Sequence, residues 1–122
     1  MPCWPVPRCG ERSYVPCSTS SGYREHPGDY GSEYGGKVIS YSGDTEWTDT
    51  LIDAARGADL FVCEAYFFEK KIKYHLDYQT LRENRQRLDC RRVVLTHMSA
   101  DMVGRWAEAD IECADDGLVI VL

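Results

Sequence analysis

The sequence predicts an α/β fold, in which helices cover a sheet. Between residues 36 and 122, short apolar runs typical of buried strands alternate with segments that carry helix-capping residues. Residues 1–35 differ, because they hold all five prolines and three of the six cysteines and show no helical or strand period. We therefore expect an irregular segment over residues 1–35 and a folded domain over residues 36–122.

The first elements follow from apolar runs and their boundaries. Lys37–Ser42 is expected to be a strand that ends at a Gly-Asp turn. Thr48 can cap a short helix, which Gly57 would close, because glycine readily takes the left-handed conformation found after helices. Leu60–Cys63 is an unbroken apolar run, typical of a strand that is covered on both faces.

The later elements are expected in the same rhythm. Asp77 can cap a helix that runs to about Leu88, and Arg92–Thr96 is a second buried strand. Ser99 can cap a short third helix. The last residues, 111–122, contain an Asp-Gly pair between two apolar runs, which predicts a closing hairpin. The alternation of strands and helices implies a sheet with helical cover.

Composition limits the classes of function. The net charge of −6 argues against a nucleic-acid surface, which needs clustered cations. The cluster of Lys70, Lys71 and Lys73 is better explained as a solvated loop than as a phosphate track. No run approaches the about 20 apolar residues of a membrane span, and prolines interrupt any N-terminal leader, so we expect a cytoplasmic protein without a membrane partner.

Six cysteines in such a chain are expected to be reduced thiols. Cys63 and Cys90 lie in apolar patterns and should be small core residues. A zinc knuckle in the N-terminal segment is disfavoured, because its cysteines lack the close pairing of such sites; the candidate ligands are Cys3, Cys9, Cys17 and His26.

Two candidate metal ligands lie where predicted strands end. Asp44 follows the first strand and His97 follows Arg92–Thr96. The carboxyl ends of parallel strands share one sheet edge, so a carboxylate and an imidazole there could reach one ion. Alternatively, Asp44 caps the following turn and His97 is only hydrogen-bonded.

Two further residues could assist. His75, in the loop after the predicted strand Leu60–Cys63, could donate a proton to a leaving group. Glu64, at the end of that strand, could orient His75 or a metal ligand, although a partly exposed glutamate there would need no such role.

Four short motifs occur in an order and spacing that resemble the C-terminal half of the metallo-β-lactamase-fold hydrolases. The nearest branch is the ribonuclease Z-like and phosphodiesterase-like one, and the resemblance covers about residues 36–122. The motifs are Tyr41–Thr45, Ala58–Ala65, Tyr74–Leu76 and Val94–Ser99.

The resemblance implies one half of an αββα sandwich and a two-metal hydrolytic site. Asp44 matches the family's bridging aspartate, His97 its last metal-binding histidine, and His75 the histidine of a His-x-Thr motif. Asp77 stands where that threonine would be. Zinc is the implied metal, with manganese or iron as alternatives, and the implied substrate is a small ester or phosphodiester, RNA included.

One metal-binding motif of the family is missing from this sequence. The family's His-x-His-x-Asp-His cluster has no counterpart in residues 1–35. We therefore expect an incomplete hydrolase that is inactive alone, through truncation, a frameshift or a misplaced start. The alternative is a non-catalytic interaction module that retains the half-sandwich, and the sequence leaves a homodimer open.

Overall fold

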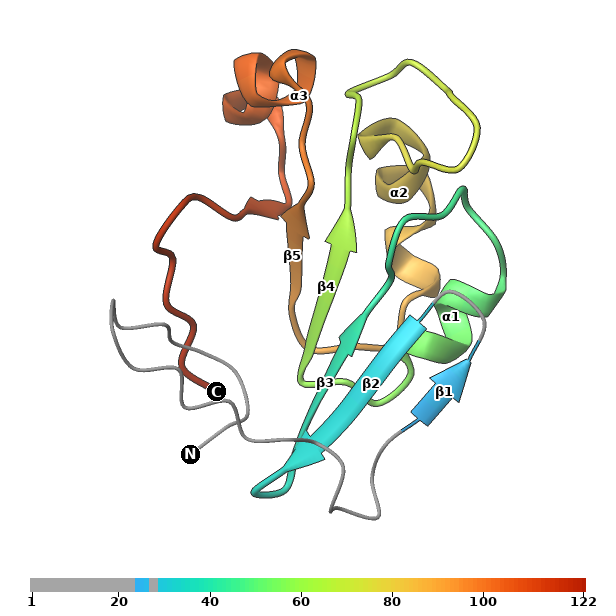
Figure 1. Ribbon diagram of the computed structural model, residues 1–122, viewed down its shortest axis with the longest axis vertical. Coiled ribbons are helices and arrows are strands. Elements are labelled where there is room, and N and C mark those ends of the chain that lie inside the picture. Colours follow the sequence, from blue (N-terminus) through green and yellow to red (C-terminus); the bar gives the residue numbers. More distant parts are fainter. Residues whose placement is uncertain (1–23, 27–28) are drawn as a thin grey trace.

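A computed structural model describes residues 24–26 and 29–122 (Figure 1). The described chain forms one six-stranded sheet, in which the strands lie side by side in sequence order from β1 to β6. Four neighbouring strands run parallel: β3 (Lys37–Tyr41), β4 (Leu60–Glu64), β5 (Val93–Thr96) and β6 (Glu112–Cys113). The carboxyl ends of β3, β4 and β5 therefore open at one edge, the upper end in Figure 1.

The first two strands correct part of the prediction for residues 1–35. β1 (Arg24–His26) and β2 (Asp29–Tyr34) form an antiparallel pair, and β2 continues antiparallel to β3. Gly35 and Gly36 connect β2 to β3 with φ angles of 58° and 76°, which side chains disfavour. A tight glycine turn thus adds strands to the sheet although their sequence has no alternating pattern. Cys3, Cys9 and Cys17 lie outside the described residues.

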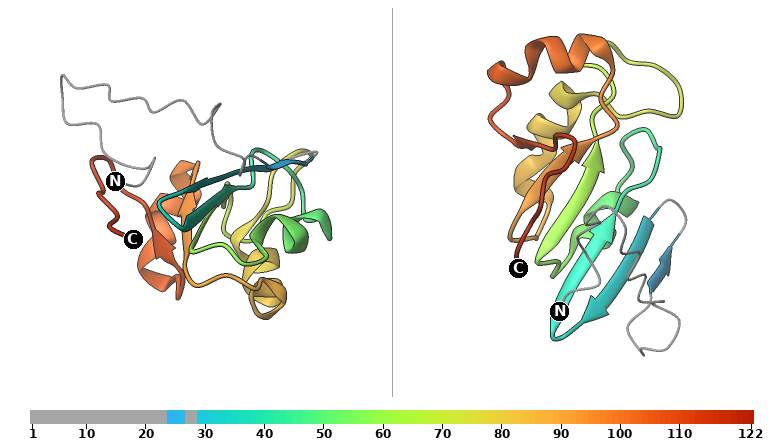
Figure 2. Two further views of the ribbon diagram at one scale, coloured as in Figure 1. Left: turned by 90° about the horizontal axis from the view of Figure 1, so that it is seen from below. Right: turned by 60° about the vertical axis from the view of Figure 1, so that its left-hand side comes forward.

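Three short helices cover one face of the sheet, as Figure 2 shows from below. They are α1 (Thr50–Ala55), α2 (Tyr78–Asn84) and α3 (Ala100–Arg105). Each lies between consecutive parallel strands, and right-handed crossovers that advance in one direction place all helices on the same face. In the described part of the chain, no helix is long and apolar enough to cross a membrane.

Two of the three predicted helix caps are confirmed, but the prediction for Thr48 is wrong: Asp49 holds the N-cap position of α1 and makes no side-chain cap hydrogen bond. The Asp77 carboxylate accepts a hydrogen bond from the Thr80 backbone N–H, and the Ser99 hydroxyl accepts one from Met102. Gly57, with a φ of 71°, follows α1 in the conformation expected for a helix-ending glycine. Single turns of 3₁₀ helix extend α2 and α3, at Arg85–Arg87 and Trp106–Glu108. The helical pattern that predicted an end near Leu88 includes the first of these turns.

The two sheet faces bury separate apolar clusters. The helix-covered cluster is the larger one and contains Phe61 and Cys63 from β4, which are fully buried. The alternate residues of β4, Leu60 and Val62, belong to the cluster on the second face, together with Ile120. This alternation explains why β4 reads as an unbroken apolar run, since both faces of the strand are covered.

The predicted closing hairpin does not form. Its turn is present, because the Leu118 N–H donates to the Asp115 carbonyl at 3.0 Å and Gly117 has a φ of 81°. Residues 118–122, however, form no strand, and β6 pairs with β5 instead. Ile120 packs on the second face of the sheet, so burial of this side chain decides the path of the chain end.

Cys63 should resist alkylation in the folded protein. Its thiol is fully buried, and burial raises its pKa to about 12, so the reactive thiolate is scarce at pH 8. Cys113 is only partly buried and serves as the internal comparison. Peptide mapping after iodoacetamide treatment should find Cys63 modified only when denaturant is present. Equal modification of both thiols in the native protein would contradict this assignment.

Candidate metal centre

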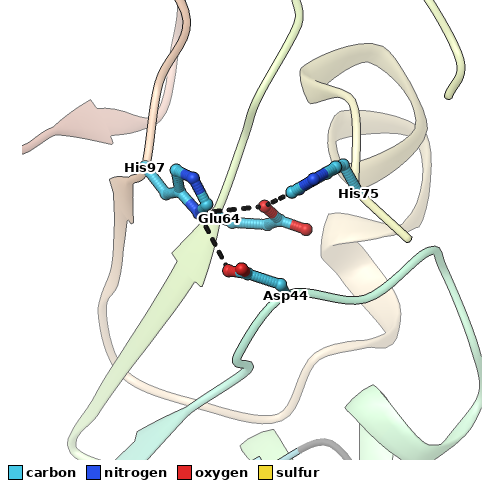
Figure 3. A group of neighbouring side chains, drawn as sticks. All are labelled: Asp44, Glu64, His75 and His97. Atoms are coloured by element: carbon cyan, nitrogen blue, oxygen red, sulfur yellow. Dashed lines mark hydrogen bonds and ion pairs between the residues drawn. The ribbon is translucent and has the colours of Figure 1, made fainter. Parts of the chain in front are cut away.

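The four candidate residues converge at the carboxyl ends of three parallel strands (Figure 3). Asp44 lies in the loop after β3, Glu64 is the last residue of β4, and His97 follows β5. His75 arrives from the loop between β4 and α2. One ligand atom of each of the four lies within 4.8 Å of the others. The edge that the sequence indicated therefore does gather these side chains.

Carboxylates and imidazoles alternate through the cluster. His97 Nδ1 lies 2.8 Å from Asp44 Oδ1 and 3.5 Å from Glu64 Oε2. His75 Nδ1 lies 2.9 Å from the same Glu64 oxygen. Glu64 thus stands between two imidazoles, while Asp44 approaches only His97 (Figure 3). In each pair the Nδ1 atom contacts a carboxylate, and such a contact fixes the orientation of a histidine ring.

The side chain of Glu64 is fully buried, which excludes the alternative of a partly exposed glutamate without a role. Its Oε1 accepts hydrogen bonds from the backbone N–H groups of Thr45, at 3.0 Å, and Leu76, at 2.9 Å. A buried carboxylate is tolerated only when it is paired and hydrogen-bonded, and both oxygens of Glu64 meet this condition. Glu64 therefore connects the loop after β3 to the loop that carries His75.

The backbone of His97 adopts the left-handed conformation, with a φ of 52°. Residues with a Cβ atom disfavour this region, and such strain often occurs at functional sites. The chain turns there from β5 into the helix-capping residue Ser99, whose N–H donates to the Tyr66 carbonyl at 2.8 Å. This turn places the imidazole over the end of β4, beside Glu64.

This strain predicts a measurable difference between two variants. His97→Gly and His97→Ala both remove the imidazole, but only glycine adopts a positive φ without steric cost. The glycine variant should be more stable than the alanine variant by about 1 kcal/mol in urea unfolding. At positions with a negative φ, an alanine variant is usually more stable than a glycine variant, so the reversed order would identify the strained turn. An alanine variant that is the more stable one would refute it.

Asp44 and His97 fit a divalent metal ion better than Glu64 does. Their side chains are 51% and 40% exposed, so an ion from solvent can reach both. Glu64 is fully buried, with both oxygens already in hydrogen bonds or ion pairs. A mixed carboxylate and imidazole set suits zinc, and also manganese and iron. The donor types and their accessibility thus agree with metal use at this edge.

Comparison with known proteins supports the same family as the motifs. The chain is 30% identical over 74 residues to ribonuclease Z of Bacillus velezensis and 32% identical over 82 residues to ribonuclease Z of Limosilactobacillus fermentum. These matches cover 57% and 63% of the chain but only 24% and 26% of the relatives, so the chain spans about a quarter of their length. No protein-family model matches it.

Solved structures give the fold. The metallo-β-lactamase fold protein YhfI from Bacillus subtilis has a TM-score of 0.63 at 18% identity, over 76% of this chain and 43% of its own. The chain carries part of a metallo-β-lactamase fold, and its sequence is similar to those of two ribonucleases Z. A diphosphatase of the PhnP family has a TM-score of 0.60 at 21% identity, over 83% of this chain and 46% of its own.

A zinc-bound structure is also similar. Zn²⁺-bound PqqB from Methylobacterium extorquens has a TM-score of 0.60 at 20% identity, over 82% of this chain and 46% of its own. All of these neighbours are at least twice as long as the part that matches. The single sheet with helices on one face is therefore a partial metallo-β-lactamase-type sandwich, as the sequence predicted.

The structure adds one residue that sequence reasoning did not assign. The Tyr66 ring stacks on the His75 ring, with centroids 4.6 Å apart, and meets His97 edge-on at 5.4 Å. The only sequence signal was a run of three aromatic residues after Glu64, which did not distinguish a site residue from core. In the same loop, Lys70, Lys71 and Lys73 are exposed, as expected for solvated side chains.

Proposed function

We propose that the chain carries one part of a metal-dependent hydrolytic site that acts on phosphodiester or other ester bonds. The observation that carries this proposal is the convergence of Asp44, Glu64, His75 and His97 at the carboxyl edge of three parallel strands. Ligand chemistry in open α/β sheets gathers at this edge. The sequence similarity to two ribonucleases Z supports a phosphodiester substrate, RNA among the candidates.

The proposal gives the residues different tasks. Asp44 and His97 are the metal ligands, because they are the accessible carboxylate and imidazole of the cluster. When bound, a divalent ion such as zinc supplies a Lewis acid that polarises the scissile group. Glu64 accepts from His75 Nδ1, which leaves Nε2 of His75 as the atom that exchanges a proton with the leaving group. Glu64 thus orients His75 and does not itself touch the substrate.

The chain matches only about a quarter of the length of the two ribonucleases Z, which supports the proposal of an incomplete site. Among the described residues, four possible ligands form the cluster. Two of them, Glu64 and His75, are paired with each other, which leaves Asp44 and His97 for a metal ion. We propose that the remaining metal ligands belong to polypeptide that the described residues do not include. A cytoplasmic location and the choice of zinc remain predictions of the same kind.

Paramagnetic broadening tests the metal site without requiring activity. Mn²⁺ should be added stepwise to the isotope-labelled chain while amide resonances are recorded. We expect broadening to begin at residues 43–45 and 97, because Asp44 and His97 hold the ion. Asp44→Ala should abolish this local effect. Competition by Zn²⁺ should restore the lost resonances in the wild-type chain.

Asp115→Ala is the matched control for general loss of negative charge. Asp115 is an exposed carboxylate in the C-terminal turn and is not one of the four clustered residues. This variant should leave the broadening at residues 43–45 and 97 unchanged. Broadening that persists in Asp44→Ala, or that centres on other carboxylates from the start, would refute the proposed site.

A second candidate is a non-catalytic interaction module. The observation that favours it is the apolar chain end, where Leu118, Val119 and Val121 are 41%, 54% and 83% exposed. Contiguous exposed apolar side chains often mark an association surface. Sedimentation velocity without metal separates the candidates, because the module should associate as concentration rises and a Val121→Asp variant should not.

A further inference from the structure

Three rings contact one another at the cluster. Tyr66 stacks on His75 at an interplanar angle of 25°, and its edge-on contact with His97 has an interplanar angle of 85°. The two imidazoles themselves meet edge-on, with centroids 5.4 Å apart. Tyr66 therefore touches both imidazoles of the candidate site, one with its face and one in perpendicular orientation.

The backbone of Tyr66 is held by hydrogen bonds on both sides, and its ring has one further aromatic contact. The Tyr66 N–H donates to the Leu76 carbonyl at 2.8 Å, and its carbonyl accepts from the Ser99 N–H at 2.8 Å. The Phe67 ring meets Tyr66 edge-on at 4.9 Å. Through these contacts Tyr66 connects the segment that carries His75 to the turn that follows His97.

The hydrogen bonds of the cluster leave a degree of freedom that Tyr66 can remove. Glu64 fixes only the Nδ1 atom of His75, so the imidazole can still tilt about that bond. His97 is 40% exposed, and its ring has solvent on one side. A planar ring packed against both imidazoles restricts this tilt, because stacked and edge-on pairs favour particular orientations by about 0.5–1.5 kcal/mol.

We infer that Tyr66 is a positioning residue of this site, whose aromatic ring holds the imidazoles of His75 and His97 in the orientation that metal binding and proton transfer require. This inference rests on the proposed function, because it concerns the same cluster. The ring carries the effect and the phenolic hydroxyl does not, since the contacts of Tyr66 with both histidines are made by the ring.

Tyr66→Phe and Tyr66→Leu separate the ring from the hydroxyl. Mn²⁺ affinity should stay at the wild-type value in Tyr66→Phe and fall about 10-fold or more in Tyr66→Leu, the loss typical when a group that orients a metal ligand is removed. In the metal-free chain at one pH, the imidazole C–H resonances of His75 and His97 should keep their ring-current displacement in Tyr66→Phe and lose it in Tyr66→Leu. Tyr66→Met, which keeps side-chain length and has no ring, replaces Tyr66→Leu if that variant does not fold.

The results distinguish the inference from the proposed function. Mn²⁺ that fails to bind at the wild-type cluster would refute the proposed function, while the metal-free imidazole resonances would still test the role of Tyr66. Unchanged resonances and affinity in Tyr66→Leu or Tyr66→Met would overturn the positioning role. A loss in Tyr66→Phe as large as in Tyr66→Leu would also overturn it, because the hydroxyl would then carry the effect. Urea unfolding of each variant shows whether a change in affinity merely follows lost stability.

Discussion

Replacing Glu64 with alanine should lower the free energy of unfolding by about 2–5 kcal/mol, because each polar group left without a partner costs about 1–3 kcal/mol and the cavity adds to this loss. Glu64 is fully buried and is held by four groups: two backbone N–H donors and two imidazoles. The substitution leaves the N–H groups of Thr45 and Leu76 without an acceptor and also opens a cavity. Few residues in this chain should have a larger effect on stability.

Glu64→Gln is the matched control for this prediction. Glutamine keeps the shape of the side chain and one carbonyl oxygen, which can still accept from Thr45 and Leu76. It replaces the oxygen that faces His75 with an amide, so the loss should be smaller than for alanine. Urea unfolding followed by circular dichroism compares the three chains, and an alanine variant within 1 kcal/mol of the wild type would show that Glu64 does not hold these loops together.

Most elements in residues 36–122 could be predicted because they carry strong local signals. β4 and β5 are largely apolar runs. Asp77 and Ser99 are capping residues, and each accepts a hydrogen bond from the backbone N–H three residues later. These signals depend only on neighbours in sequence, so tertiary contacts have little opportunity to override them.

Other features depend on distant residues and could not be predicted in this way. The apolar pattern of residues 118–122 suits a strand, but Ile120 is buried against β4 and β5 on the second face of the sheet. The strands β1 and β2 have no alternating pattern and are specified by pairing, β2 with β3 and β1 with β2. Local sequence gives no information on such long-range pairing.

The candidate site shows the same division. The sequence placed Asp44 and His97 at strand ends, and parallel pairing of β3, β4 and β5 then brings the two side chains to 2.8 Å. The burial of Glu64 depends on loops that fold over the end of β4 from both sides, and the stacking of Tyr66 on His75 depends on the path of its loop. Neither loop has a regular pattern, so only the three-dimensional structure reveals these two roles.

The purified 122-residue chain should hydrolyse a generic phosphodiester no faster than buffer that contains the same metal. A two-metal mechanism holds two ions about 3.5–4 Å apart and stabilises the attacking and leaving oxygens together. Asp44 and His97 supply one accessible carboxylate and one accessible imidazole, and a catalytic zinc normally takes about three protein ligands. The chain should also retain little metal after dialysis, because so few ligands bind weakly.

Metal analysis and hydrolysis of bis(p-nitrophenyl) phosphate check this prediction, with Asp44→Ala and His97→Ala beside the wild-type chain. All three should give the background rate, since the wild type lacks a competent site to lose. Robust turnover by the wild type that either substitution abolishes would refute the incomplete half-site. The missing ligands would then come from residues 1–34 or from a second copy of the chain. The dependence of specific activity on chain concentration would distinguish these sources, because only ligands from a second copy require two chains in one site.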